Sequence, residues 1–354
     1  MTAVTDRLVV ADQAREIWSP VPGYLNAATL GLPPRAVVSA MQDGLLQWQT
    51  GQACPVRYGE LAEQARRSYA ELVSVSTGTV AIGSQTSVLV GTVASSVPDG
   101  AEIVCVTGDF TSVSGPFLAQ EHRGVTVRHV PLADLAQAIG PSTHLVAFSL
   151  AQSSTGELID AGAVTEAATR HGALTLCDLT QAAGWMPVDA SAFDITVCSG
   201  YKWLCQPRGT AYLTVSPATL ERITPVNAGW YAGESVWESV YGPELHLAQD
   251  ARRLDVSPAW LCWLGAAAAG EALAALDMAQ VRDHDIALAN DLRERLGLDL
   301  CARPVVTLED PDGARVTRLE EAGVRCASRA GRVRLAFHAW NTTADVDVVA
   351  DAAR

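Results

Sequence analysis

Residues 195–203 read ITVCSGYKW, a short β-branched apolar run followed at once by small and polar residues. The run predicts a buried strand over residues 195–198, so Lys202 follows the carboxyl end of that strand. Lys202 is the only lysine in a chain that contains 24 arginines. A lysine amine, unlike a guanidinium, can lose its proton and form an imine with a carbonyl group. The retained lysine therefore suggests a catalytic amine, with chance retention in an arginine-biased composition as the alternative.

Similar apolar runs alternate with helical periodicity on both sides of this stretch. They predict strands at residues 79–83, 103–107, 126–130, 144–150, 173–177, 195–198 and 210–215. Asp160 can cap a helix that runs to about His171 and stops at Gly172. Strands that alternate with helices form a mainly parallel sheet flanked by helices, so the fold class is α/β.

The pattern changes after Asp255. Helices are expected at residues 259–276 and 278–296, short strands at 304–308, 324–327 and 333–337, and a last helix from Thr343. We therefore expect a large domain over residues 51–255 and a smaller C-terminal α/β domain over 256–354, with an N-terminal segment, 1–50, packing against the smaller one.

The composition limits the partners and the compartment. The net charge of −14 and a pI near 4.9 oppose binding to nucleic acid or to an anionic membrane. The start of the chain lacks the pattern of a signal peptide, and the longest apolar stretch, 259–270, is too short to span a bilayer. Eight cysteines lie without a CxxC pair or a zinc-like cluster, so neither a metal site nor disulfides are expected. A soluble, cytoplasmic protein is the resulting expectation.

Asp178 closes the strand that precedes the lysine strand. A carboxylate at the end of a buried strand needs a cationic partner, and the protonated pyridine nitrogen of pyridoxal phosphate is one. Gln181, three residues later, can reach the phenolic oxygen of such a ring. The alternative for Asp178 is a helix cap.

Two other strand ends supply what such a cofactor needs. Residues 83–87, GSQTS, place hydroxyl and amide groups between a strand and an apolar helix, as a phosphate site requires. Phe110 follows the strand at 103–107 and can stack on a ring, although packing in the core is its alternative.

The order of these parts resembles the class V aminotransferase family of fold-type I pyridoxal-phosphate enzymes, from Tyr24-Leu25-Asn26 to the RLAFHAWNT segment at 334–342. The DxxQ and SGYKW segments carry the resemblance most specifically. It implies that Lys202 binds the cofactor covalently, that Asp178 pairs with the pyridine nitrogen and that Gln181 contacts the ring oxygen. It also implies a set of phosphate contacts, Gln85, Thr86, Ser199 and Tyr201, with Phe110 as the stacking residue and two substrate contacts, Asn26 and Arg334. A homodimer is expected, since sites of this family resemble subunit-interface clefts.

The reaction is less determined than the cofactor. Desulfurases of the family attack sulfur with a cysteine on a long loop before the C-terminal arginine, whereas here Cys326 lies only eight residues before Arg334, so persulfide chemistry is not expected. The layout looks most similar to the lyases that cleave a carbon–sulfur bond, which predicts β-elimination from a cysteine conjugate. Transamination, epimerisation or a decarboxylating conversion is the alternative.

Three further residues and one further class of protein stay open. Trp230 and Tyr231 can line the pocket, reach the partner subunit or simply pack, and His338 is either a pocket residue or structural. A catalytically silent binding protein on the same fold is opposed by the joint presence of Lys202 and Arg334 with Asp178 and Gln181.

Overall fold

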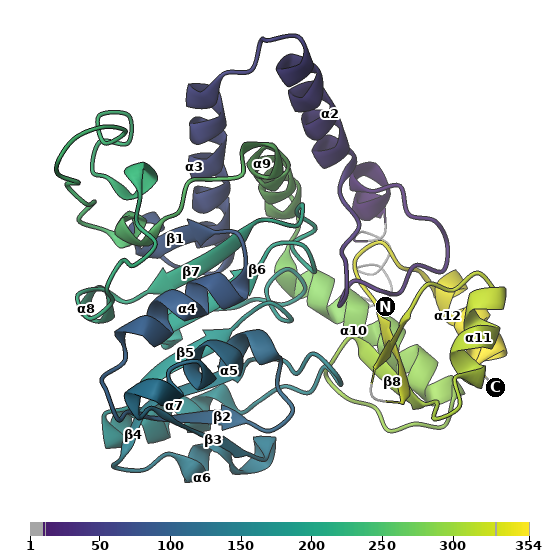
Figure 1. The fold of residues 1–354 in the computed structure, drawn as a ribbon. Helices are drawn as coiled ribbons and strands as arrows, with labels where there is room; N and C mark the ends of the chain where they lie inside the picture. Colours follow the sequence, from purple (N-terminus) through teal and green to yellow (C-terminus); the bar gives the residue numbers. More distant parts are fainter. Residues whose placement is uncertain (1–9, 11, 330, 354) are drawn as a thin grey trace.

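The computed structural model describes residues 10, 12–329 and 331–353, and Figure 1 shows their arrangement. A seven-stranded sheet has the order β1-β7-β6-β5-β4-β2-β3, and a three-stranded sheet has the order β8-β10-β9. The larger sheet consists of β1 (Val80–Gly83), β2 (Glu102–Val106), β3 (Thr126–Val130), β4 (Thr143–Ser149), β5 (Leu174–Asp178), β6 (Ile195–Ser199) and β7 (Ala211–Val215). The expected α/β fold with a mainly parallel sheet is confirmed.

The direction of the strands decides where the site lies. Strands β2 to β6 are parallel neighbours, and β7 runs antiparallel to β6 on one side and to β1 on the other. Only β7 is therefore reversed in this sheet, and the carboxyl ends of the other six strands meet at one edge. Ligands of open α/β sheets bind at that edge.

Alternating side chains of the strands build two apolar layers. On one face they pack against α3 (Pro55–Leu72), α7 (Ala161–His171) and α9 (Trp260–Ala274), and on the other against α4 (Thr86–Ser96) and α5 (Thr111–Leu118). Helix α7 has the predicted ends, because Asp160 accepts a hydrogen bond from the Ala163 N–H and Gly172 takes φ 70°. The short helices α6 (Leu135–Ala138) and α8 (Pro217–Leu220) complete this part.

The smaller sheet lies beside the larger one in Figure 1, with the last helices packed around it. It consists of β8 (Val305–Glu309), β9 (Ala327–Arg329) and β10 (Arg332–Ala336), and its helices are α10 (Met278–Arg295), α11 (Ala314–Glu321) and α12 (Thr343–Ala352). The strand expected at 324–327 is wrong in position. Val324 is buried in the apolar cluster of this sheet and Arg325 bridges to Tyr24, so pairing with β10 begins only at Ala327.

The N-terminal segment joins the two sheets. Tyr24 bridges to Arg325 and Asn26 to Ala336, after which the chain enters α2 (Arg35–Gln49). Helix α9, which the predicted boundary assigns to the C-terminal domain, packs against α3 and α2. The division at residues 50 and 255 stays a prediction.

Within the described ranges no single helix is long and apolar enough to cross a membrane, and α9 with α10 meets that criterion only as a pair bent by 85°.

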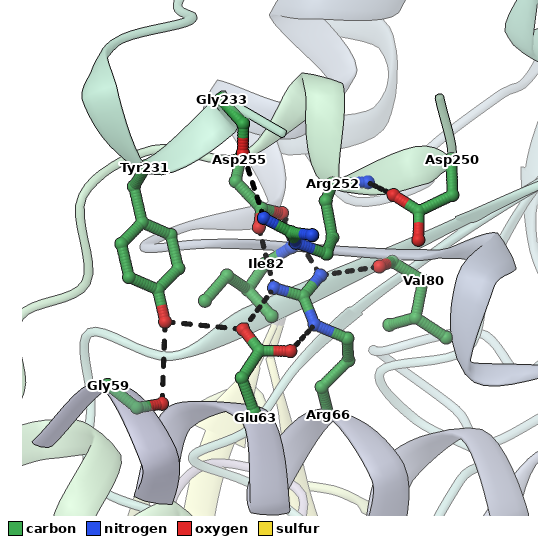
Figure 2. Close-up of polar contacts among 10 residues, drawn as sticks. All are labelled: Gly59, Glu63, Arg66, Val80, Ile82, Tyr231, Gly233, Asp250, Arg252 and Asp255. Carbon is green, nitrogen blue, oxygen red and sulfur yellow. Dashed lines mark hydrogen bonds and ion pairs between the residues drawn. The ribbon is translucent and has the colours of Figure 1, made fainter. Parts of the chain in front are cut away.

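A buried ion pair closes the free edge of β1, as Figure 2 shows. Arg66 of α3 donates to both carboxylate oxygens of Asp255, at 3.1 and 2.6 Å, and both side chains are fully buried. The same guanidinium donates to the Val80 carbonyl at 2.6 Å, and Asp255 accepts from the Ile82 N–H at 2.8 Å. The outer backbone groups of an edge strand are thus satisfied by a charged pair instead of another strand.

The pair extends into a wider network. Glu63 binds Arg66 at 2.9 Å and accepts from the Tyr231 hydroxyl at 3.2 Å. Burial opposes the charge on Arg66, but Asp255 and Glu63 raise the pKa of the guanidinium above its ordinary value. The network therefore fixes α3, β1 and the segment after β7 together.

Replacing Arg66 with Met leaves Asp255 buried without its cation. We expect the free energy of unfolding to fall by about 3–5 kcal/mol, the usual cost of breaking a buried pair. Urea denaturation followed by circular dichroism measures it. Arg57→Met is the matched control. Arg57 forms an ion pair with Glu60 on the same helix at 2.9 Å, and both side chains are largely exposed. We expect this substitution to lower the free energy of unfolding by less than about 1 kcal/mol. Equal losses in the two variants would contradict the assigned role.

Candidate active site

Four strand ends place the predicted residues at one edge of the sheet. Thr86 follows β1, Phe110 follows β2, Asp178 ends β5, and Ser199 with Lys202 ends and follows β6. Contacts confirm that they converge, since Thr86 Oγ1 lies 2.7 Å from Ser199 Oγ and Lys202 Nζ lies 5.0 Å from the centre of the Phe110 ring.

The turn after β1 has the features of a phosphate site. Helix α4 begins at Thr86, and its N-terminal cap residue, Gln85, makes no side-chain cap hydrogen bond. The Thr86 hydroxyl at this helix N-terminus lies 2.7 Å from the Ser199 hydroxyl. Both hydroxyl-bearing side chains are buried. Ser199 is held in turn, because its N–H donates to Thr180 Oγ1 at 3.0 Å. Two fixed hydroxyls beside a helix N-terminus suit an anion with several oxygens.

Asp178 is a buried carboxylate that lacks an ion pair among the described residues. Its Oδ1 accepts the Thr180 N–H at 2.8 Å, which is a turn contact two residues away, not a cap on a following helix. Burial raises the pKa of Asp178 to about 6, although the Thr180 hydrogen bonds and the charge of Lys202 oppose that rise. Such a carboxylate gains much from a cationic partner in the cleft.

Lys202 is almost completely enclosed, with 5% of its surface exposed. Burial and the nearby guanidinium of Arg334 lower the pKa of its amine to about 8, against the attraction of Asp178. A substantial share of the amine is therefore neutral near pH 8 and able to accept a proton or attack a carbonyl carbon. Phe110, 41% exposed, faces this amine at the edge of the sheet, so its alternative placement in the core is wrong.

The backbone around Lys202 is fixed by the N-terminal segment. Gly31 N–H donates to the Tyr201 carbonyl at 2.9 Å, and a Cβ at Gly31 would lie 1.9 Å from the Lys202 carbonyl oxygen. Only glycine fits this approach. The Tyr201 side chain lies between Lys202 and Arg208, whose guanidinium carbon is 4.9 Å from the ring centre.

Gln181 connects the lysine loop to the N-terminal segment. Its Oε1 accepts from Trp203 Nε1 at 2.7 Å, and its Nε2 donates to the Ala28 carbonyl at 3.0 Å and to Ser153 Oγ at 3.2 Å. Both amide hydrogens are thus engaged within the protein. The contact with a ring oxygen expected of Gln181 stays a prediction, and it would require Ser153 to give up its bond.

Arg334 enters the same region from β10. Its guanidinium donates to Thr29 Oγ1 at 2.6 Å and to the Ser153 carbonyl, while Nε is buried without a partner. It is 2% exposed and has no carboxylate partner in the described part of the chain. Burial, with the charge of Arg329, lowers the pKa of Arg334 to about 10. Asn26, on the neighbouring segment, also buries an unpartnered Oδ1. The unpartnered Arg334 Nε–H suits an anionic group of a ligand, whereas Asn26 Oδ1 can accept a hydrogen bond only from a donor.

The residues present fit pyridoxal phosphate. The hydroxyl pair at the start of α4 would hold its phosphate, Asp178 would face its ring nitrogen, Phe110 would cover the ring and Lys202 would bind its carbonyl carbon. These groups come from the ends of four strands, with β6 supplying both Ser199 and Lys202, and among the described residues neither Asp178 nor Lys202 forms an ion pair within 4 Å.

The residues left open in the sequence lie outside this cleft. Tyr231 is buried and bonds Glu63, and Trp230 packs on it with ring centres 5.4 Å apart. His338 is completely buried, and its Nε2 lies 3.1 Å from the Trp203 carbonyl beneath the lysine loop. These are contacts within one chain, and a role of Trp230 or Tyr231 in a partner subunit's site stays a prediction.

Sequence reasoning missed residues that hold the predicted ones. Thr29 and Ser153 bind Arg334, and Asp109 accepts hydrogen bonds from the Phe110 N–H, at 2.7 Å, and from Ser149. Thr29 lies three residues after Asn26, and Asp109 directly precedes Phe110, so their positions beside predicted site residues could have identified them. Ser153 had no such signal, because its contacts lie 181 and 28 residues away.

The lowered pKa of Lys202 is directly testable, because the chain has one lysine. In the cofactor-free protein the amine reacts only when neutral, so its modification by trinitrobenzenesulfonate should reach half of its maximal rate near pH 8 instead of near 10.5. Peptide mass spectrometry separates this site from the Met1 amine. Arg334→Met should move the midpoint upward, because a neighbouring positive charge is removed. A midpoint near 10.5 would show an amine in contact with water.

The comparisons with known proteins agree with this geometry. Residues 24–313 match the model of the family described as aminotransferase class-V. An uncharacterized aminotransferase of Bacillus subtilis, YcbU, is 28% identical over 80% of this chain and 80% of its own, and the isopenicillin N epimerase of Amycolatopsis lactamdurans is 28% identical over 77% and 74%. In structure, the cysteine desulfurase CsdA of Escherichia coli superimposes with a TM-score of 0.83 at 21% identity, covering 97% of both chains. The chain belongs to the aminotransferase class-V family and is a pyridoxal-phosphate enzyme that acts on amino acids.

Proposed function

We propose that this enzyme cleaves the carbon–sulfur bond of a cysteine conjugate by β-elimination. With water, the overall reaction gives a thiol, pyruvate and ammonia. The observation that carries the proposal is the enclosure of a weakly basic amine, Lys202, together with an arginine that lacks a counter-ion, Arg334.

Arg334 would bind the α-carboxylate of the substrate. A planar guanidinium matches a carboxylate with two parallel hydrogen bonds, and the unpartnered Nε is available for one of them. Thr29 and Ser153 hold the other nitrogens, so the fork is oriented before the substrate arrives. The substrate carboxylate would replace water without a large rearrangement.

Lys202 would move the protons. Its amine, with a pKa near 8, removes the α-proton and can then deliver a proton to the departing sulfur. When bound, pyridoxal phosphate supplies the electron sink that stabilises the negative charge left at the α-carbon, and Asp178 supports it by holding the ring nitrogen protonated. One proton carrier is sufficient for this sequence. Epimerisation by two opposed bases needs a second carrier, and His338 is enclosed beneath Trp203.

Cys326 opposes the desulfurase alternative. The thiol packs against the apolar cluster of the small sheet, just before β9. Burial, with Glu320 and Asp310, raises the pKa of Cys326 to about 11, so it remains a thiol at neutral pH. Only a thiolate attacks sulfur efficiently.

Transamination is the second candidate, and the likeness to the Bacillus subtilis aminotransferase favours it. It would use the same lysine and the same arginine. The two reactions differ in whether sulfur leaves the substrate.

The products formed from an S-alkyl-L-cysteine distinguish β-elimination from transamination. We expect equal amounts of pyruvate and thiol, measured by coupling to lactate dehydrogenase and by a thiol reagent. Lys202→Ala should lower kcat by about 10²–10⁴-fold, the usual contribution of a general acid–base group. Cys326→Ser should keep its activity, since its thiol lies outside the proposed chemistry.

Other products would contradict the proposal in distinct ways. A keto acid that retains the sulfur would indicate transamination, and a D-amino acid would indicate epimerisation. Loss of activity in Cys326→Ser would indicate a desulfurase reaction in which Cys326 attacks the substrate sulfur.

We also propose that the enzyme is a homodimer in the cytoplasm. Leu45, Leu46 and Trp48 on α2 are 49–66% exposed, and Trp48 borders an apolar cavity of about 370 Å³ between α2, α3 and α9. Apolar surface of this kind favours association. All eight cysteines are free, as in a reducing compartment.

Light scattering tests the dimer. We expect twice the chain mass of 37.3 kDa for the wild type and a shift toward one chain mass for Leu46→Glu. Leu300→Glu is the matched control, because Leu300 is 62% exposed but lies after α10, away from α2. A single chain mass for the unmodified enzyme would contradict the proposal.

A further inference from the structure

A second arginine lies beside Arg334 on the small sheet. In the antiparallel pair of β9 and β10, Arg329 is opposite Arg332, and Arg334 is two positions further along β10. Alternation along a strand puts all three on one face, and a diagonal neighbour lies about 7–8 Å away. This is the face from which Arg334 reaches Ser153 in the cleft.

The three arginines differ in their partners. Arg332 is exposed and forms an ion pair with Glu309 at 2.7 Å. Arg334 contacts neutral oxygens, and the Arg329 guanidinium donates a hydrogen bond to the Ser328 carbonyl at 2.7 Å. In the described part of the chain, neither Arg329 nor Arg334 has a carboxylate partner within ion-pair distance.

Two neighbouring positive charges without a counter-ion are unfavourable in the free protein. Burial lowers the pKa of Arg334 and the charge of Arg329 lowers it further. Arg329 also lowers the pKa of Lys202, by less than burial and Arg334 do. The field of Arg329 therefore reaches the centre of the cleft. Only one of the two arginines is accounted for by the α-carboxylate of an amino acid.

From this placement we infer that the substrate carries a second carboxylate on its side chain and that Arg329 binds it. The inference rests on the proposed role of Arg334 in binding the α-carboxylate. It specifies the substrate class as an acidic amino acid derivative, for example a cysteine with a carboxyalkyl group on sulfur. Arg329 is exposed and lies diagonal to Arg334 on the neighbouring strand, so it would contact the far end of the side chain and not the reacting atoms.

The first test measures binding without turnover. Heptanedioate has two carboxylates with the same number of atoms between them as S-(2-carboxyethyl)-L-cysteine, and heptanoate has one. Neither has an amine for the cofactor to react with. Calorimetric titration of the cofactor-loaded enzyme should show heptanedioate binding more tightly than heptanoate by about 10-fold, the effect of one charged hydrogen-bonded contact. Arg329→Gln should bring the ratio of the two dissociation constants close to one. Arg332→Gln, on the same sheet face but paired with Glu309, should leave the ratio as it is.

The second test uses turnover. The kcat/KM for S-(2-carboxyethyl)-L-cysteine should exceed that for S-propyl-L-cysteine in the wild type, and Arg329→Glu should shift the preference toward S-(2-aminoethyl)-L-cysteine. A reversal of charge preference is not a consequence of general misfolding.

The outcomes separate the inference from the proposed reaction. If heptanedioate is preferred through Arg329 but no thiol is released, β-elimination is wrong and the acidic substrate class stands. If thiol is released but the ratio of the heptanedioate and heptanoate dissociation constants is the same in wild type and Arg329→Gln, the inference is overturned.

Discussion

The enclosure of three charged groups in one cleft is the constraint to which the rest of the structure is adjusted. Asp178, Lys202 and Arg334 are each at most 5% exposed, and their separation from water costs free energy that pairing only partly restores. Burial raises the pKa of Asp178 and lowers those of Lys202 and Arg334, so each group is shifted toward its neutral form. These shifts make the cleft receptive to a group that brings a cation for Asp178, a carbonyl for Lys202 and a carboxylate for Arg334.

Such a cleft needs a rigid frame, because small displacements would let water reach the charges. The Arg66–Asp255 pair closes the free edge of β1, the strand that ends at the phosphate turn. On the other side, the Trp203 indole N–H donates to the Gln181 side chain, and the Trp203 carbonyl lies 3.1 Å from His338 Nε2. These contacts link the loop that carries Lys202 to the end of the small sheet. The two sheets therefore hold the cleft from opposite sides.

The choice of reaction depends on what surrounds this shared machinery. The raised pKa of the Cys326 thiol opposes sulfur transfer, and the single amine suits a reaction with one proton carrier. Arg329 then adds a positive charge at the edge of the cleft, where a substrate side chain would end. Specificity would thus come from the small sheet, while residues at the edge of the large sheet would hold the cofactor.

The sequence by itself predicted the α/β fold, the strand ends and the convergence of Thr86, Phe110, Asp178 and Lys202, because these depend on local periodicity and on the common direction of parallel strands. It misplaced the strand at 324–327, where pairing with Tyr24 competes with pairing to β10. It also did not reveal Ser153, the occupied amide of Gln181 or the edge of β1 closed by an ion pair. Those features join residues that are far apart in the chain, so only the tertiary structure decides them. The contacts form only when the elements that carry the two residues pack together, and no local sequence pattern specifies which distant residue each one will contact.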